Sequence, residues 1–207
     1  MRRISSIAAL LLCAAANGQY LADAGRPDPA EDFFKAGDKA YRSGDHATAI
    51  AAYSKAIELS PEHVNAYLHR GFCHSLLKEY AEAVADFAAV IEARPEHSQA
   101  YLSRGSALAK LGRHDEAIND FDRVIAIDAR NGEAFNNRGW SKYKLGNTES
   151  GLRDIRLAGR KNPSNAMVDR NLGVIANEQG NLQLACTLCR LSSRWRKLSL
   201  CSYCMFS

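Results

Sequence analysis

The apolar positions of this chain recur with a fixed period. A glycine returns every 34 residues. Around it the apolar and small residues are spaced three or four positions apart, as in Tyr101, Gly105 and Leu108. A second run with similar spacing follows in each period, as in Phe121 and Val124. The recurring glycines are Gly37, Gly71, Gly105, Gly139 and Gly173. Each run lies on one side of an α-helix, so the pattern predicts recurring pairs of helices without strands.

Other recurring residues indicate where these helices end and how they pack. When the recurring glycine is counted as position 8, position 15 is again glycine in four of the five periods, and it is Lys78 in the second. A glycine there supplies the left-handed residue that ends a first helix. Proline at position 32, as in Pro61 and Pro95, closes the second helix because it has no N–H to donate. Small residues at positions 8 and 20 would let the two helices approach closely.

These positions resemble the tetratricopeptide repeat family, whose pattern has Gly, Ala and Pro at positions 8, 20 and 32 and large residues at 4 and 24. The resemblance covers about residues 30 to 185. It implies an all-α fold, a right-handed solenoid of stacked helical hairpins with a concave inner surface. Four full repeats and a degenerate fifth are expected. Their predicted bounds are 30–63, 64–97, 98–131, 132–165 and, for the partial repeat, 166–185.

Two charges depart from the family pattern together. Position 7 is arginine and position 23 is aspartate in the same three repeats, whereas both positions are apolar in the first and fifth. An arginine in a mostly buried stripe is costly unless it is paired, which predicts an ion pair between the two helices of one repeat. The alternative is two solvated charges that merely share ancestry. The predicted pairs are Arg70 with Asp86, Arg104 with Asp120, and Arg138 with Asp154.

The first residues have the composition of a secretory signal. Two arginines precede an apolar run, residues 4–16, which is shorter than a membrane-spanning helix. Small residues follow, so we expect a signal peptide over residues 1–24, cleaved after Ala16 or Ala24, and a linker at 25–29. Export to the periplasm or the exterior is therefore expected. The alternative is an uncleaved segment that anchors the chain to a membrane.

The net charge gives no sign of a nucleic-acid partner. Residues 186–207 contain four basic and no acidic residues, which accounts for the formal net charge of +4. The repeats therefore lack the excess of lysine and arginine that binding to a phosphate backbone requires.

Residues 186–207 also hold four of the six cysteines, in two pairs. Their spacing superficially matches a four-thiolate zinc site. However, Cys186 and Cys189 occupy positions that would pack within a helix, and exported thiols tend to form disulfides. A mis-read or non-functional end, disulfides or free thiols, and zinc remain open. We expect no metal or other cofactor, and we expect Cys73 to be a buried thiol.

Catalysis has little support in the sequence. Four histidines recur in pairs at helix junctions, His63 with His97 and His46 with His114. There is no glycine-rich phosphate loop and no nucleophile motif. We therefore predict that the protein is not an enzyme and has no small-molecule substrate.

The resemblance instead implies that a ligand peptide lies against the first helices, at positions 2, 5, 9, 12 and 13. These positions carry many aromatic side chains, which are candidate anchors for a protein partner. Phe72 and Trp140 have an alternative role in packing between repeats. The candidate residues are Phe34, Asp38, Tyr41, Leu68, Phe72, Leu102, Ser106, Asn136, Trp140, Tyr143 and Arg170.

The sequence thus predicts a scaffold that holds another polypeptide or peptide in its groove, within the cell envelope. Two alternatives stay open. One is a metal-binding or thiol-redox accessory protein that uses the C-terminal cysteines. The other is a structural array that self-associates through its unfinished end.

Overall fold

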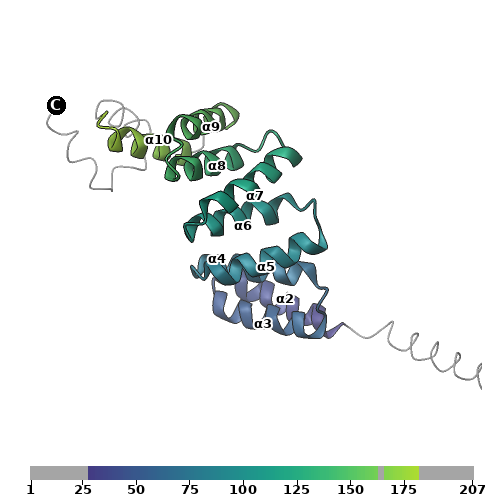
Figure 1. The fold of residues 1–207 in the computed structure, drawn as a ribbon. Coiled ribbons are helices and arrows are strands. Elements are labelled where there is room, and N and C mark those ends of the chain that lie inside the picture. Colours follow the sequence, from purple (N-terminus) through teal and green to yellow (C-terminus); the bar gives the residue numbers. More distant parts are fainter. Residues whose placement is uncertain (1–27, 163–165, 182–207) are drawn as a thin grey trace, which may run out of the picture. The chain divides into compact units, whose positions relative to one another are not determined.

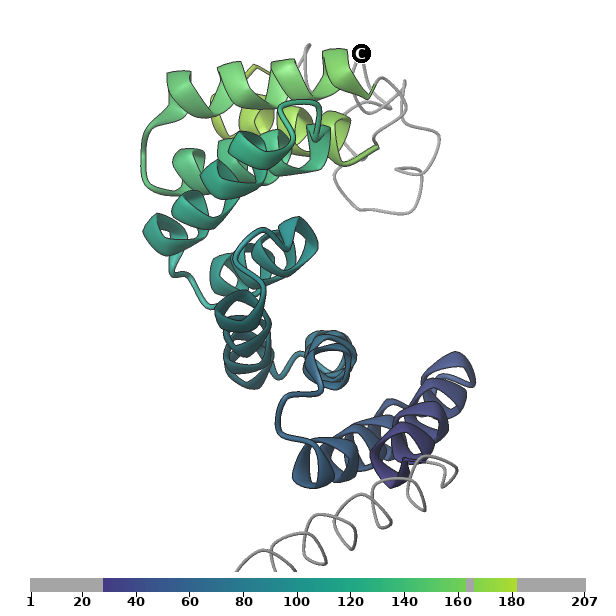
Figure 2. The ribbon, with the colours of Figure 1, turned by 90° about the vertical axis from the view of Figure 1, so that its right-hand side faces the viewer.

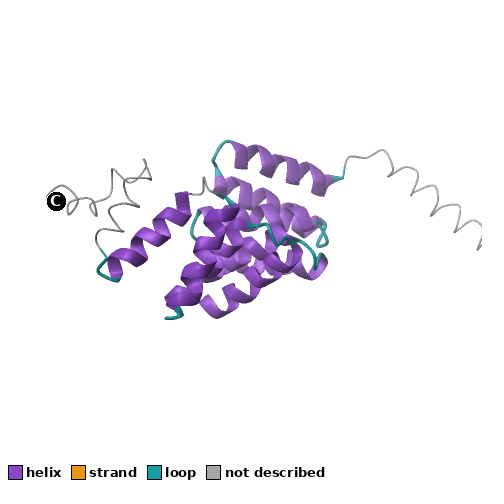
Figure 3. Ribbon diagram, turned by 90° about the horizontal axis from the view of Figure 1, so that it is seen from above, coloured by secondary structure: helices purple, strands orange, loops and turns teal. Residues whose placement is uncertain are grey.

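The computed structural model describes residues 28–162 and 166–181, and the regular elements of these ranges are all helices (Figure 3). The predicted signal at residues 1–24 and the predicted tail at residues 186–207 lie outside them. The described helices are α2 (Pro29–Arg42), α3 (His46–Leu59), α4 (Val64–Leu76), α5 (Tyr80–Ala93), α6 (Ser98–Lys110), α7 (His114–Ile127), α8 (Gly132–Lys144), α9 (Thr148–Lys161) and α10 (Ala166–Glu178).

The chain divides into two compact units, Met1–His63 and Val64–Ser207. In the first unit, α2 packs against α3 as a single hairpin (Figure 1). In the second unit, three hairpins, α4 with α5, α6 with α7 and α8 with α9, follow one another, and α10 packs on α9. Figure 2 shows the same hairpins from the side. Within the second unit α4 contacts α6, α6 contacts α8 and α8 contacts α10, so the first helices of successive repeats are neighbours.

A left-handed residue at position 15 follows the first helix of each repeat. Gly44, Gly112, Gly146 and Gly180 have φ values of 82°, 78°, 84° and 74°. Lys78 takes the same conformation at φ 65°, where a side chain is less favourable than glycine. The predicted helix stop is therefore present after each of the five first helices, α2, α4, α6, α8 and α10.

The recurring glycines bring the paired helices into close contact. A Cβ atom on Gly105 would lie 2.8 Å from Cε1 of Phe121, a ring that is fully buried. Gly139 is packed more tightly, because a Cβ atom there would lie 2.7 Å from the backbone oxygen of Gly151. A residue with a side chain at these positions would force the two helices apart.

Polar side chains before several helices accept hydrogen bonds from the first turn. Asp45 accepts from the backbone N–H of Thr48 at 3.1 Å. At the start of α8, Asn131 accepts from the N–H of Ala134 at 2.9 Å, and His97 does the same at the equivalent position before α6. These caps satisfy backbone donors that have no partner inside the helix.

Candidate functional site

The surface of interest is the first-helix face of the second unit, which we define by positions 2, 5, 9, 12 and 13 of α4, α6, α8 and α10. Because these helices contact one another in order, the same positions recur along one side of the unit. The predicted residues on this face are Leu68, Phe72, Leu102, Ser106, Asn136, Trp140, Tyr143 and Arg170.

Two of the predicted residues are buried in the packing between helices. Leu102 is 5% exposed and lies in the core cluster that includes Phe121. Asn136 is 1% exposed, and its side-chain oxygen accepts a hydrogen bond from Nδ2 of Asn171 at 3.0 Å. The Nδ2 atom of Asn136 also donates to Oδ1 of Asn137 at 3.1 Å. These two side chains hold neighbouring repeats together and offer little surface to a ligand.

Phe72 and Trp140 are half-buried, so both packing and an exposed part of the ring are present. The ring centroid of Phe72 lies 5.4 Å from that of Phe87. Trp140 packs against the core cluster that joins the fourth repeat to α10, and the Nζ atom of Lys144 lies 4.8 Å from the centre of its ring. Both rings are therefore held in fixed orientations at equivalent positions two repeats apart.

Tyr143 lies beside Trp140, with their ring centroids 5.7 Å apart. Its hydroxyl donates a hydrogen bond to the carboxylate of Glu178 on α10. That hydrogen bond, assisted by burial, raises the pKa of Tyr143 to about 12, so the phenol stays protonated at neutral pH. The contact ties α8 to α10 at the edge of the face.

The remaining predicted residues of this face differ in burial. Leu68 is half-buried and packs beside the cluster of Ala83 and Phe87. The hydroxyl of Ser106 donates to the backbone oxygen of Leu102 at 2.8 Å. Arg170 lies on α10 and is exposed.

The three predicted residues of the first unit lie on α2. The side chain of Asp38 accepts a hydrogen bond from the hydroxyl of Tyr53 on α3 at 2.7 Å. Phe34 lies against two rings, with centroid distances of 5.7 Å to Tyr53 and 4.8 Å to His63. Phe34 and Asp38 thus help to pack this hairpin, whereas Tyr41 is 37% exposed.

Each of the three arginines at position 7 lies against the aspartate at position 23 of its own repeat, as the sequence predicts. Arg70 donates to both carboxylate oxygens of Asp86, at 2.9 and 2.6 Å. Arg104 does the same to Asp120 at 2.9 and 2.7 Å. The bidentate geometry and the burial of the carboxylates make these charge-assisted bonds strong.

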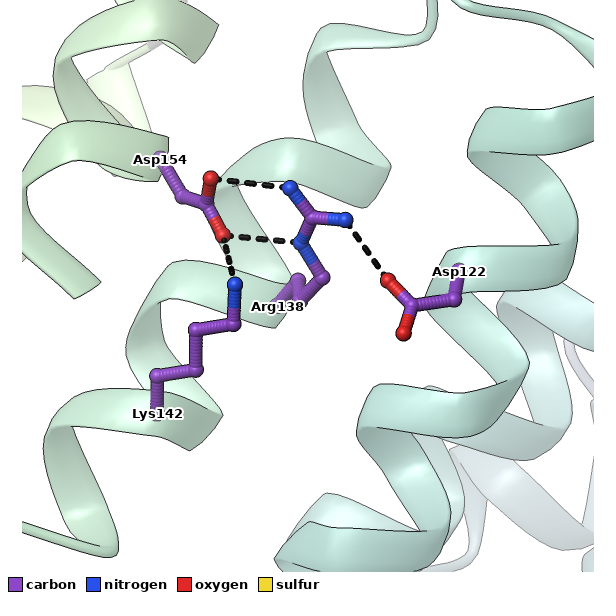
Figure 4. Close-up of polar contacts among 4 residues, drawn as sticks. All are labelled: Asp122, Arg138, Lys142 and Asp154. Carbon is purple, nitrogen blue, oxygen red and sulfur yellow. Dashed lines mark hydrogen bonds and ion pairs between the residues drawn. The ribbon is translucent and has the colours of Figure 1, made fainter. Parts of the chain in front are cut away.

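The third pair is part of a larger network (Figure 4). Arg138 donates to both oxygens of Asp154 at 2.7 and 2.8 Å, and Lys142 donates to the same carboxylate at 2.8 Å. The remaining guanidinium nitrogen lies 2.6 Å from Asp122 on α7, which links repeats three and four. Burial raises the pKa of Asp154, but the hydrogen bonds from Arg138 and Lys142 outweigh it and lower that pKa on balance. The network therefore stabilises the fold at neutral pH, and this contribution is lost as the pH falls through the lowered pKa.

Sequence reasoning missed the residues that occur in only one repeat. Asp122 and Lys142 have no counterpart of the same type in the neighbouring repeats, so the period gave no signal for them. The buried Asn171 was also missed, although Asn137 occupies the same position of the fourth repeat. Lys144 was identifiable, since it follows Tyr143 at position 13 of the face.

The described residues contain no group of three His, Cys, Asp or Glu side chains placed to hold a metal ion. Cys73 is a buried thiol, as expected. The four C-terminal cysteines lie outside the described residues. None of the described helices is both long enough and apolar enough to cross a membrane.

Comparison with known families identifies the repeats. A family model described as tetratricopeptide repeat matches residues 77–134 and 136–192, and a TPR repeat model matches residues 37–77. The first model alone covers more than half of the chain. The chain therefore belongs to the tetratricopeptide repeat family. A search of curated proteins finds no match.

Solved structures with the same fold agree with this assignment. MamA from Desulfovibrio magneticus RS-1 (residues 41 to the end) has a TM-score of 0.73 and 18% identity, and the match covers 83% of this chain and 97% of that one. YrrB, described as a TPR protein with an unusual peptide-binding site, has a TM-score of 0.67 and 20% identity over 90% of this chain and 96% of its own. The first TPR of Spaghetti (RPAP3), bound to the HSP90 peptide SRMEEVD, has a TM-score of 0.55 and 26% identity over 57% and 94%. The expected all-α solenoid of helical hairpins is confirmed.

Proposed function

We propose that this protein is a scaffold that binds a segment of another polypeptide on the first-helix face of its second unit. The observation that carries this proposal is the pair of aromatic rings at Phe72 and Trp140. Both rings are anchored by packing and only half-buried. Rigid aromatic side chains of this kind bind a partner at low cost in conformational entropy.

Polar side chains lie between the two rings. Ser106 lies at the equivalent position of the intervening repeat, and Nδ2 of Asn137 lies 3.4 Å from its hydroxyl oxygen. These groups can exchange hydrogen bonds with the backbone of a bound segment. The arrangement favours a segment with apolar or aromatic side chains two repeats apart and accessible peptide groups between them.

The arginines at position 7 disfavour nucleic acid as the partner, because they are already paired. Arg70, Arg104 and Arg138 are each held by an aspartate, so their charges are already neutralised within the repeats. A phosphate backbone would need a row of basic side chains that is not committed in this way. A polypeptide ligand also agrees with two of the structural neighbours, since RPAP3 is described with a bound peptide and YrrB with a peptide-binding site.

We further propose that the protein works in the cell envelope. The composition of residues 1–24 supports this, because it matches a secretory signal. Cleavage after Ala16 or Ala24 would shorten the chain, so the mass of the protein isolated from cells tests this part of the proposal. A mass equal to that of the uncleaved chain would favour the membrane-anchored alternative instead.

Changing Trp140 to alanine is expected to weaken partner binding at least tenfold, which corresponds to about 1.4 kcal/mol or more and is typical of an aromatic hot spot. The measurement is quantitative capture of partners by the immobilised mature protein. Ile127→Ala is the matched control, because it removes an exposed apolar side chain from α7, outside the first-helix face. Circular dichroism establishes that both variants keep their helices.

Two results would redirect the assignment. Equal capture by Trp140→Ala and the wild type would remove the first-helix face from consideration. If removal of residues 186–207 then abolished capture or changed the oligomeric state, the C-terminal cysteine or self-association alternative would replace it.

A further inference from the structure

The charge of α9 sets it apart from the other described second helices. Helix α9 contains four basic and two acidic residues. By contrast, α5 contains three acidic residues and no lysine or arginine, and α7 contains four acidic residues and one arginine. Helix α3 contains one lysine and one glutamate. The excess of basic residues occurs in one repeat only, so it is not a product of the period.

Three of these basic residues form a stripe along one side of α9. Arg153, Arg156 and Arg160 follow one another at intervals of three and four residues, which places them on the same side of the helix over about 10 Å. All three are exposed, and none of the corresponding residues of α3, α5 and α7 is lysine or arginine. Asp154 does not compensate the stripe, because it is buried and bonded to Arg138.

The stripe continues onto the loop that precedes α8. The Nζ atom of Lys161 donates a hydrogen bond to the backbone oxygen of Ala129 at 2.7 Å and lies 5.2 Å from the centre of the Phe135 ring. This contact places the exposed Arg130, which is the next residue of the loop, beside the last turn of α9. We define the basic patch as Arg130, Arg153, Arg156, Arg160 and Lys161.

The arginines of the basic patch have no acidic partner within the described residues. Their side chains form no ion pair there, whereas Arg113 is bonded to Glu116 and Arg123 lies 3.4 Å from Glu96. The residues outside the described ranges include one acidic residue, Asp23. The chain itself therefore supplies almost no counter-charge for the patch.

Helix stability does not account for the stripe. Arg160 and Lys161 lie in the last turn of α9, where a positive charge interacts favourably with the helix dipole. Arg153 and Arg156 lie further from that end, and like charges three or four residues apart destabilise a helix. Charges that are kept at a cost to the helix indicate an anionic partner outside the chain.

The composition of the patch favours a lipid surface as this partner. Helix α9 contains no aromatic side chain on which a base could stack, and its exposed stripe has no apolar anchor for a folded protein. A nucleic-acid duplex carries phosphates at a fixed spacing, so a duplex that extended past the patch would also meet the acidic helix α7. A fluid bilayer gathers its anionic lipids beneath a basic patch and leaves neutral lipids elsewhere.

We propose that the basic patch binds the anionic headgroups of a lipid bilayer and so docks the second unit on a membrane surface. The guanidinium groups donate hydrogen bonds to lipid phosphates, and each cation strengthens binding roughly fivefold. The patch shares no residue with the first-helix face. Membrane contact and a bound polypeptide therefore do not compete for the same side chains.

The test is binding of the full chain to two kinds of vesicle, one of phosphatidylcholine alone and one of equal parts phosphatidylcholine and phosphatidylglycerol. The readout is the ratio of the two affinities, because any binding by the apolar run at residues 4–16 is common to both. Loss of the stripe is expected to lower this ratio by at least about tenfold, since three cations together account for on the order of 100-fold. The variant combines Arg153→Gln, Arg156→Gln and Arg160→Gln.

The matched control removes three exposed lysines of the first unit and is expected to keep the wild-type ratio; it combines Lys35→Gln, Lys39→Gln and Lys55→Gln. Net charge falls equally in the two variants, and circular dichroism checks that both keep their helices. Duplex DNA and polyglutamate are tested alongside the vesicles. The membrane assignment is overturned if the arginine variant keeps the wild-type ratio, if both variants lower it alike, or if the arginine variant loses more affinity for DNA or polyglutamate than for anionic vesicles.

Discussion

Replacing Arg104 by leucine is expected to lower the free energy of unfolding by about 3 kcal/mol. The reason is that Asp120, which is 4% exposed, would lose both of its hydrogen bonds to the guanidinium and remain as a buried unpaired charge. Urea denaturation followed by circular dichroism measures the change.

The control for this variant is present in the chain itself. The fifth repeat has leucine at both positions of the pair, Leu172 and Leu188. Arg104→Leu combined with Asp120→Leu is therefore expected to stay within about 1 kcal/mol of the wild type, since replacement of a buried ion pair by apolar residues is often neutral. A single variant that unfolds like the wild type would show that the bridge behaves as a solvated surface pair.

Replacing Gly139 by alanine is expected to destabilise the fourth repeat by about 2 kcal/mol. The new methyl group would lie 2.7 Å from the backbone oxygen of Gly151, and neither helix can move without disturbing its neighbours. Because the opposing atom is backbone and cannot turn aside, the cost lies at the upper end of the range of about 1–3 kcal/mol for overpacking, which leaves a net loss of about 2 kcal/mol after the gain of roughly 1 kcal/mol that alanine offers in a helix. Thermal unfolding measures the difference.

Gly173→Ala is the matched control, because Gly173 occupies the same position of the fifth repeat. No described atom lies within 4 Å of its Cβ position, so no described backbone opposes the new methyl group, and any loss of stability is expected to be smaller than for Gly139→Ala. A comparable loss in both variants would mean that the cost comes from the helix itself and not from the approach of the two helices.

The fold was predictable because its determinants recur. The glycine at position 8, the small residue at position 20 and the left-handed residue at position 15 act within one hairpin, so each appears once per 34 residues. The arginine–aspartate bridge was predictable for the same reason, since its two members appear and disappear together. Compensation between two positions indicates contact even when only one sequence is available.

The details of the first-helix face were less predictable because they depend on contacts between repeats. Leu102 and Asn136 occupy face positions in the pattern, yet each is buried against a neighbouring helix. The partner of Asn136 is Asn171, which lies on the first helix of the following repeat, α10. Periodicity assigns a side chain to one side of a helix, but it does not distinguish an exposed position from one covered by the adjacent repeat.

The most direct test of the proposed binding face is a photo-crosslinking comparison in cells. Benzoylphenylalanine is placed at Lys110, an exposed residue at position 13 of the first-helix face, and separately at Asn119, an exposed residue of the second helix α7 in the same repeat. The proposal predicts that irradiation attaches a defined polypeptide to the chain substituted at 110 and none to the chain substituted at 119. Equal labelling at both positions, or labelling at 119 alone, would contradict it.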